Sequence, residues 1–183
     1  MGQQQDNIIS LLEKSGFKSI DLNPDFTKLL AAYSKEINNV YKSLGGILPD
    51  APIKFGKFDF VCSDFILEFD EEQHFNRYRK LTLNAAIYPI EHFNLHDYFD
   101  YCLSKESLCL KKASFGKYWT SPSTEKQFGK SNEKGDLTVN GSARWKQRAY
   151  YDFLKDAWAK SENIKLIRLS MFDENIAQSI SKL

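Results

Sequence analysis

The sequence predicts an α/β protein with a mixed central β-sheet flanked by helices. The chain has 183 residues, of which 42% are hydrophobic and 14% aromatic, enough to build one domain around a buried core. The spacing of apolar residues indicates, in order, helix, two strands, insertion, helix and strand. That order is typical of a sheet with helices packed on its faces. We therefore expect a single domain over residues 1–183, with a basic, loop-rich insertion at about residues 111–142.

Two helices are expected before the first strand. The first covers residues 5–15 and ends near Gly16, since glycine commonly follows the last turn of a helix. The second starts after Asp25, whose side chain can cap the first turn, and ends at Gly45. Its apolar residues recur at helical spacing and predict one buried stripe, formed by Phe26, Leu29, Leu30, Tyr33, Ile37, Val40 and Leu44.

The remaining elements follow from the same reasoning. Runs rich in aromatic and branched residues predict strands over residues 54–62, 65–70 and 164–170. Helices are expected around residues 95–108 and over residues 143–161, where the apolar residues again fall on one side. The last helix should turn its aromatic side towards the sheet.

Carboxylates stand inside the two central predicted strands, where the pattern favours buried residues. A turn at residues 63–64 is the shortest common hairpin connection. In that register Asp59 lies directly opposite Glu68, and Lys57 lies opposite Asp70. Glu68 and Asp70 are two residues apart, so they share one face of their strand. The sequence thus brings three acids and one lysine to a single patch.

Opposed carboxylates are destabilising, and each shifts the pKa of the other. A divalent cation removes the repulsion, because proteins bind Mg²⁺ through one or two carboxylates together with water and phosphate oxygens. The sequence therefore predicts a metal site with Asp59, Glu68 and Asp70 as ligands. The alternative is a sheet with one wet face, on which the same acids are simply solvated.

Three blocks of sequence follow one another in a recognisable order. They are FDF at residues 58–60, FILEFDEEQHF at residues 65–75 and RAYYDFLKDAWAKSENIKLIRLS at residues 148–170. Together they resemble the PD-(D/E)XK nuclease superfamily, most closely the branch around very-short-patch repair endonucleases and related small phage and bacterial nucleases. The resemblance implies a restriction-endonuclease-like fold and phosphodiester hydrolysis assisted by Mg²⁺ or Mn²⁺.

The resemblance also implies roles for individual residues. Asp59 would be the first metal carboxylate and Glu68 the second acid, while Asp70 stands where the motif has its lysine. Gln73 and His74 match a Gln-His pair that would orient water or stabilise phosphate.

Two features of the superfamily have more than one candidate in this chain. The missing motif lysine has two replacements, Lys57 across the hairpin and Lys155 on the last predicted helix. A glutamate on a helix before the strands has Glu36 as its first candidate and Glu13 as its second, although a solvated surface acid is the simpler interpretation of either. Glu71 replaces the usual glycine after the motif, which leaves the geometry of that turn open.

The stretch from residue 111 to residue 148 is basic, with nine Lys or Arg residues against three acids. Basic loops that carry aromatic residues suit nucleic acids, because cations neutralise phosphates and rings stack on bases. A solvated surface insertion is the alternative. The aromatic candidates are Phe115, Tyr118, Trp119, Phe128 and Trp145. The candidate nucleic-acid-binding residues are Lys111, Lys112, Lys117, Lys126, Lys130, Arg144, Lys146 and Arg148.

The cysteine and histidine content bounds the compartment and the metals. Cys62, Cys102 and Cys109 include no CxxC pair, which favours a reducing compartment over a disulfide framework. His92 and His96 are spaced for a helical metal site, yet the cysteine spacing matches no compact zinc pattern, and no structural zinc is expected. The chain lacks a signal-peptide pattern and any apolar run long enough to span a bilayer, so we expect a cytoplasmic protein without a membrane partner.

These features predict a metal-dependent endonuclease acting on DNA in restriction, phage defence or repair, with RNA as an open alternative substrate. A second hypothesis is a catalytically inactive nuclease-fold module for nucleic-acid binding or assembly, suggested by the missing motif lysine. A carboxylate-pair glycosidase is a third, and the basic insertion disfavours it. Both a monomer and a homodimer are compatible with the sequence.

Overall fold

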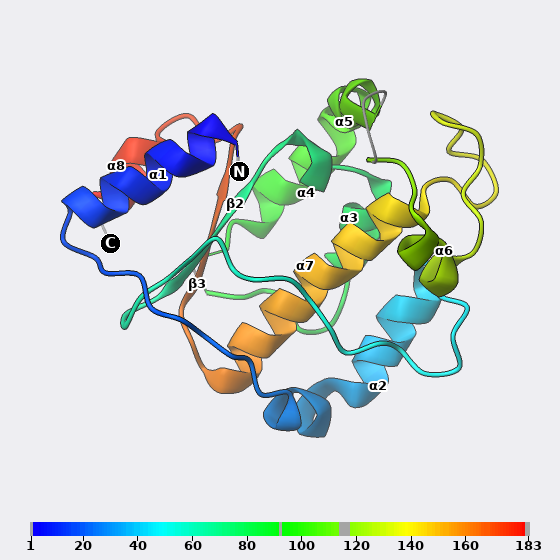
Figure 1. Ribbon diagram of the computed structural model, residues 1–183, viewed down its shortest axis with the longest axis horizontal. Coiled ribbons are helices and arrows are strands. Elements are labelled where there is room, and N and C mark those ends of the chain that lie inside the picture. Colours follow the sequence, from blue (N-terminus) through cyan, green and yellow to red (C-terminus); the bar gives the residue numbers. More distant parts are fainter. Residues whose placement is uncertain (1, 92, 114–117, 182–183) are drawn as a thin grey trace.

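The computed structural model describes residues 2–91, 93–113 and 118–181, and it has the predicted α/β class, with a small mixed sheet flanked by helices (Figure 1). The sheet has the order β1-β2-β3. Its strands are β1 (Phe60–Val61), β2 (Ile66–Asp70) and β3 (Leu166–Ser170). β1 runs antiparallel to β2, and β3 runs parallel to β2.

The hairpin between β1 and β2 has the register expected from the sequence. Phe60 pairs with Leu67 and Val61 with Ile66, so the turn at residues 63–64 is confirmed. The predicted strand over residues 54–62 is wrong in length, because only two of its residues pair.

The aromatic residues of that segment explain the short strand. Phe55 and Phe58 pack on Trp158, with ring centroids 6.2 and 5.6 Å apart. The chain before β1 therefore follows the long helix α7 (Ala143–Glu162) instead of extending the ladder.

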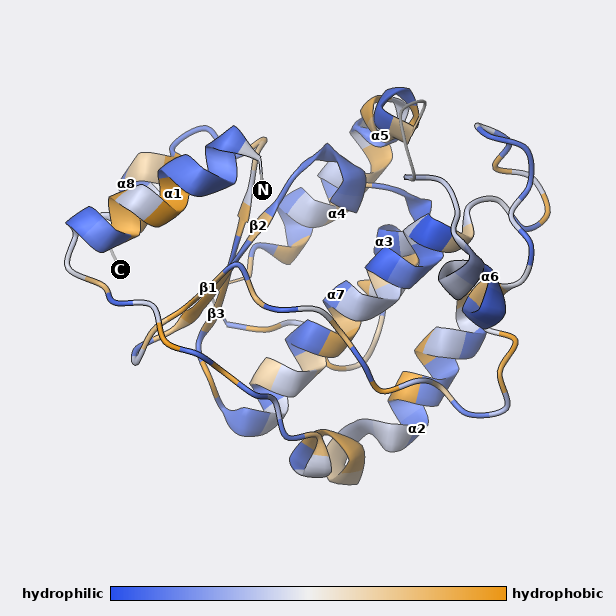
Figure 2. Ribbon diagram, in the orientation of Figure 1, coloured by the Kyte–Doolittle hydropathy of each residue, from blue (hydrophilic) through white to orange (hydrophobic). Residues whose placement is uncertain are grey.

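The two faces of the sheet carry different layers because strand side chains alternate. Ile66 and Leu166 contribute to the larger core, which is covered by α2 (Thr27–Ser43), α3 (Arg77–Thr82), α4 (Leu95–Ser104) and α7. Leu67 and Ile167 contribute to a second core on the other face, where α1 (Gln3–Lys14) and α8 (Ile176–Ile180) pack together (Figures 1 and 2). Glu68, Asp70 and Arg168 follow the alternation of the first face and so point towards α7.

Two short elements that the sequence did not predict link β2 to this helical layer. The 3₁₀ turn η1 (Glu72–His74) follows β2 directly. Asn76 caps α3 by accepting hydrogen bonds from the backbone N–H groups of Tyr78 and Arg79.

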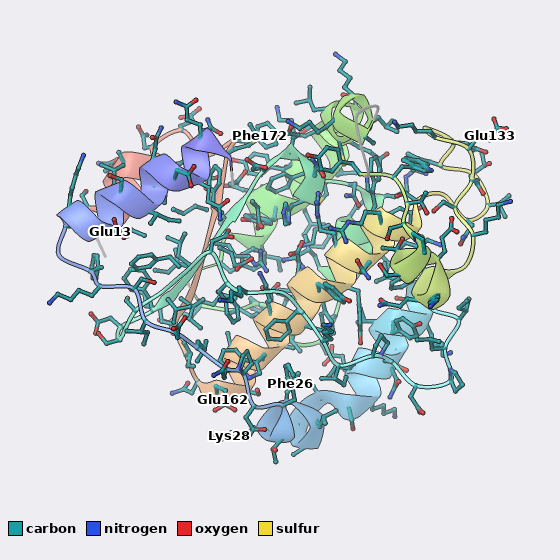
Figure 3. All side chains as sticks on the ribbon, in the orientation of Figure 1. Glu13, Phe26, Lys28, Glu133, Glu162 and Phe172 are labelled. Carbon is teal, nitrogen blue, oxygen red and sulfur yellow. The ribbon has the colours of Figure 1, made fainter. Side chains whose placement is uncertain are left out.

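The predicted insertion is more ordered than a loop. It contains the end of α5 (Glu106–Ala113), the capped helix α6 (Pro122–Phe128) and a loop that reaches away from the sheet, where Glu133 is labelled (Figure 3). Trp119, Phe128 and Trp145 are buried, so the prediction that these rings stack on bases is wrong. Phe115 lies outside the described residues, and Tyr118 is exposed.

Across the ranges that the structure describes, no helix is both long and apolar enough to cross a membrane.

Candidate active site

Asp59 and Glu68 interlock across the hairpin, as the register predicts. The backbone N–H of Asp59 donates to Glu68 Oε1 at 3.1 Å, and the N–H of Phe69 donates to Asp59 Oδ2 at 2.8 Å. Glu68 is only 3% exposed, and burial raises its pKa to about 7 although Lys155 opposes the shift. Burial also raises the pKa of Asp59. The carboxylate of each acid therefore accepts a backbone N–H at or next to the other acid.

Lys155 on α7 supplies the positive charge at this pair. Its Nζ lies 2.8 and 2.7 Å from the two carboxylate oxygens of Glu68 and donates to the backbone carbonyl of Lys57 at 2.8 Å. The expectation that a bound cation must neutralise the two acids is wrong for Glu68, because the chain provides its own ammonium group.

Lys57 does not take the place predicted for it. The paired part of β1 starts at Phe60, and Lys57 is exposed whereas Asp70 is 1% exposed. The predicted pairing of Lys57 with Asp70 is wrong, because the ladder between β1 and β2 ends before it reaches either residue. Between the two candidates for the missing lysine, the structure brings only Lys155 onto a motif acid.

Gln5 on α1 is a neighbour of Asp59 that sequence reasoning missed. Its Nε2 donates to Asp59 Oδ1 at 2.6 Å, across 54 residues of sequence. Nothing in the polar run of glutamines at residues 3–5 distinguishes it. Glu36 instead accepts the backbone N–H of Ile87 at 3.1 Å, and Glu13 is exposed at the far end of α1 (Figure 3). The structure brings neither glutamate to the motif acids.

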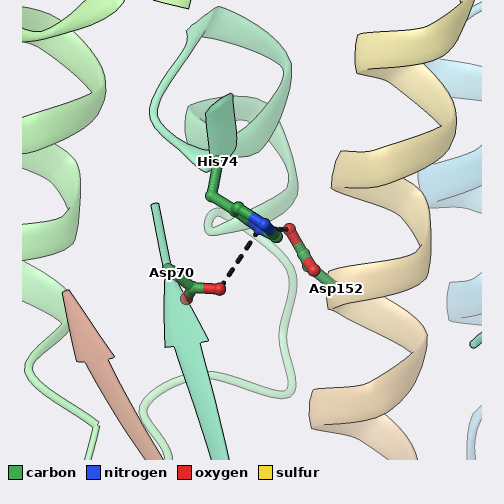
Figure 4. A group of neighbouring side chains, drawn as sticks. All are labelled: Asp70, His74 and Asp152. Carbon is green, nitrogen blue, oxygen red and sulfur yellow. Dashed lines mark hydrogen bonds and ion pairs between the residues drawn. The ribbon is translucent and has the colours of Figure 1, made fainter. Parts of the chain in front are cut away.

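A second group of side chains lies one step further along β2. His74 Nδ1 lies 3.2 Å from Asp70 Oδ1 and 2.8 Å from Asp152 Oδ2 (Figure 4). The two carboxylates are buried, whereas the His74 side chain is 21% exposed. The three ligand atoms lie within 4.8 Å of one another, so the group can hold a metal ion.

This group differs from the ligand set predicted from sequence. Within the described part of the chain, Asp59, Glu68 and Asp70 do not form such a group. Asp70 joins His74 and Asp152 because the ends of β2 and η1 meet the middle of α7 at this point.

Arg168 on β3 anchors Asp70. Its Nη1 donates to Oδ1 at 2.9 Å and to Oδ2 at 2.7 Å, and the Tyr98 hydroxyl donates to Oδ2 at 2.8 Å. Burial raises the pKa of Asp70, but Arg168 and His74 lower it by more, so the net shift is downward. Burial also raises the pKa of Asp152, and there too His74 and Arg168 outweigh it. Both acids are therefore held in the charged form.

The charge network continues to Asp156, which the sequence analysis did not single out. Arg168 Nε donates to Asp156 Oδ1 at 2.6 Å, and Arg79 Nη2 donates to Oδ2 at 2.8 Å. The Tyr88 hydroxyl also donates to Oδ2. Asp156, Arg79 and Arg168 are each no more than 4% exposed. The network ties α3 and α7 to the sheet and fixes the carboxylates that face His74.

Gln73 and the predicted nucleic-acid-binding residues lie in different surroundings. Gln73 Oε1 accepts a hydrogen bond from Arg148 Nη1, and Lys112 pairs with Glu72 at 3.1 Å, so these cations border η1. Lys146 is 5% exposed and donates to Asn140, so the prediction that it contacts nucleic acid is wrong. Arg144 donates to Gln147, Lys117 lies outside the described residues, and the exposed remainder comprises Lys111, Lys126 and Lys130.

The histidines considered for zinc do not assemble in the described structure. His96 is exposed and lies 3.6 Å from Asp100, and His92 lies outside the described residues. The three cysteines are buried.

Comparison with known proteins places the chain in a family. Residues 39–183 match DUF7255, a family of unknown function, and the chain belongs to that family. No curated protein and no solved structure matches it. Helix α1, which carries Gln5, lies outside the matched residues.

Proposed function

We propose that the protein is a metal-dependent endonuclease that hydrolyses DNA phosphodiester bonds in restriction, phage defence or repair. The observation that carries the proposal is the convergence of Asp59, directly before β1, Glu68 on β2 and Lys155 on α7, with the Lys155 ammonium group on both oxygens of Glu68. Two acids and a lysine on a sheet-helix core are the parts that the resemblance to PD-(D/E)XK nucleases requires. The choice of DNA as substrate rests on that resemblance.

The electrostatics suit proton transfer and charge stabilisation at neutral pH. A general base works best when its pKa lies near the working pH, and burial raises the pKa of Glu68 to about 7. In the proposed reaction Glu68 accepts a proton from the attacking water, and the Lys155 ammonium group stabilises the negative charge that develops on the phosphate. A groove of about 660 Å³, lined by Phe26 and by residues 19–24 and 55–61, gives substrate access to Asp59.

The metal in this proposal is Mg²⁺ or Mn²⁺, held by Asp70, Asp152 and His74. The donor set fits, because carboxylate oxygens suit both ions and manganese also accepts imidazole. When bound, the ion supplies Lewis-acid polarisation of the phosphate. Arg168 holds Asp70 with two hydrogen bonds, so it orients that carboxylate and also competes with the ion for its charge.

Cleavage of supercoiled plasmid with Mg²⁺ or Mn²⁺ tests the activity. We expect Glu68→Gln to abolish cleavage and to leave DNA binding intact. Glu162→Gln is the matched control, because Glu162 lies at the far end of α7, where it pairs with Lys28 at 2.6 Å (Figure 3). Full cleavage by Glu68→Gln would refute the assignment of the base.

Metal binding has its own readout. Titration with Mn²⁺ by calorimetry should give one binding event in the wild type. Asp152→Asn should weaken it at least about tenfold, because losing only a hydrogen-bond partner of a metal ligand already costs about 10–100-fold. Unchanged binding in Asp152→Asn would move the metal away from this group.

A catalytically inactive nucleic-acid-binding module is the second candidate, and one observation favours it. Both oxygens of Asp59, Glu68 and Asp70 already accept hydrogen bonds from the protein's own groups. A wild type that binds DNA but cuts neither DNA nor RNA with Mg²⁺, Mn²⁺, Co²⁺ or Ca²⁺ would favour this candidate over the enzyme.

A further inference from the structure

The outer edge of β3 is an unpaired strand edge in the described structure. β3 is the last strand of the order β1-β2-β3. The Ile66 N–H donates to the C=O of Lys165, and the Met171 N–H donates to the C=O of Asp70. The backbone N–H and C=O groups of odd-numbered residues along β3 therefore point towards β2. Because backbone groups alternate along a strand, the N–H and C=O groups of Leu166 and Arg168 point outward.

The outward backbone groups of Ser170, the last residue of β3, are already hydrogen-bonded. Its outward N–H donates to the side chain of Asp173 at 2.8 Å, and its C=O accepts the N–H of Asp173 at 3.0 Å. The turn after β3 therefore completes the last outward position in the way a neighbouring strand would. Only Leu166 and Arg168 are left to pair with an incoming chain.

A groove runs along this edge. It has a volume of about 840 Å³ and is lined by Ile167, Arg168 and Leu169 of β3, by Asn94, Asp97 and Tyr101 around α4, and by Asn175 and Ser179 at α8. Leu166 borders a second groove of about 300 Å³, which shares Lys165 with the first. Because α4 and α8 cover opposite faces of the sheet, the groove is a slot in the plane of the sheet with a helix on each side. An extended chain advances about 3.3 Å per residue, so a segment of five to seven residues fits the length of β3.

The charge of the groove is negative at one end. Asp97, Asp173 and Glu174 line it, and none of them makes an ion pair with a cation of the described chain. Burial raises the pKa of Asp173, and the nearby charge of Asp97 raises it further. The same acids raise the pKa of Tyr101 to about 12, after the larger effect of burial. An incoming cation therefore relieves repulsion between these acids.

We propose that the edge of β3 is a docking site for an extended, basic segment of a partner protein, which adds to the sheet as a fourth strand. Its backbone pairs with Leu166 and Arg168, which gives about four hydrogen bonds. Its Lys or Arg side chains reach Asp97, Asp173 and Glu174. Its alternate, apolar side chains lie over Ile167 on the α8 side.

Charge disfavours a second copy of the chain as the occupant. In an antiparallel self-pair centred on Arg168, the three acids of each copy face the end of the other copy that carries Lys160 and Lys165. Three acids against two cations leave the contact with excess negative charge. A basic partner has no such excess, and like charges at an interface select against the wrong partner.

The test uses the full chain and a fluorescein-labelled peptide of sequence Lys-Val-Lys-Val-Lys-Val-Lys in fluorescence anisotropy. Asp97→Asn combined with Glu174→Gln should weaken binding about tenfold, the effect of losing two surface charge pairs. Asp100→Asn is the matched control, because it lies on α4 outside the groove lining and is exposed. Equal binding by all three proteins, or no binding at all, would overturn the proposal.

Two further measurements separate strand addition from simple charge attraction. Only alternate residues of an added strand bond to β3, so N-methylation of either the lysines or the valines, but not of both series, should abolish binding. Binding that survives N-methylation of both the lysines and the valines, or that is lost with either, would refute strand pairing. The free protein should sediment as a monomer. A dimer that the peptide dissociates would instead assign the groove to a second copy of the chain.

Discussion

The substitution Asp156→Asn tests whether the buried charge network holds the helical layer to the sheet. The Asp156 carboxylate is 1% exposed and accepts hydrogen bonds from Arg79, Tyr88 and Arg168. An asparagine has nearly the same shape but one acceptor oxygen and no charge. Arg168 keeps its two bonds to Asp70, whereas Arg79, which is 1% exposed, loses the one salt bridge that it makes with the described residues.

The expected loss is that of a broken buried ion pair, about 3–5 kcal/mol in the free energy of unfolding. Urea unfolding followed by tryptophan fluorescence measures it, with an unchanged dependence on urea as the sign that the two end states are the same. Arg79→Met combined with Asp156→Leu should recover part of the loss, since it removes Arg79 and its partner together and leaves Arg168 with its two bonds to Asp70. A loss below about 1 kcal/mol for Asp156→Asn, the level of an exposed pair, would refute the network as a stabilising element.

Three more predictions concern other ion pairs and hydrogen bonds of the structure. Lys155→Met should destabilise the fold more at pH 9 than at pH 5 in urea unfolding, because the raised pKa of the buried Glu68 leaves that acid protonated at pH 5 and charged without a partner at pH 9; equal losses at both pH values would contradict this. Gln5→Glu should cost more stability than Gln5→Ala at pH 8, because it sets a second carboxylate on Asp59, and the difference should shrink as the pH falls; a stabilising Gln5→Glu would disprove the contact. Burial raises the pKa of Glu106, but its hydrogen bonds with Arg77 lower it by more, so Glu106→Gln should cost about 0.5 kcal/mol at pH 7, and this difference should vanish as the pH falls below the lowered pKa; a difference that persists at pH 2 would rule out the ionic contribution.

The sequence was informative where structure depends on near neighbours. The register of the β1-β2 hairpin follows from a two-residue turn, and the observed pairing of Phe60 with Leu67 is the one this turn imposes. The long helix α7 begins at its predicted first residue, Ala143, and ends one residue beyond the predicted end, because helical periodicity over many residues is a strong signal. Short elements such as α3 left no comparable signal.

The ionic partners of the acids were beyond sequence reasoning. The sequence contains 25 Lys and Arg residues, and nothing local distinguishes the one that will face a given carboxylate. Glu68 meets Lys155 across 87 residues and Asp70 meets Arg168 across 98. Each pairing depends on which helix covers which face of the sheet, and an error of one residue on a strand would turn the side chain to the opposite face.

The sequence alone thus determined the α/β class, the hairpin and the side-by-side placement of Asp59 and Glu68, because turn length and side-chain alternation act over a few residues. Only the tertiary structure decided that Lys155 neutralises Glu68, that Asp70 joins His74 and Asp152, and that Gln5 contacts Asp59. Those contacts join side chains of elements that are far apart in the sequence, and the packing of the two helical layers on the sheet sets which side chains meet.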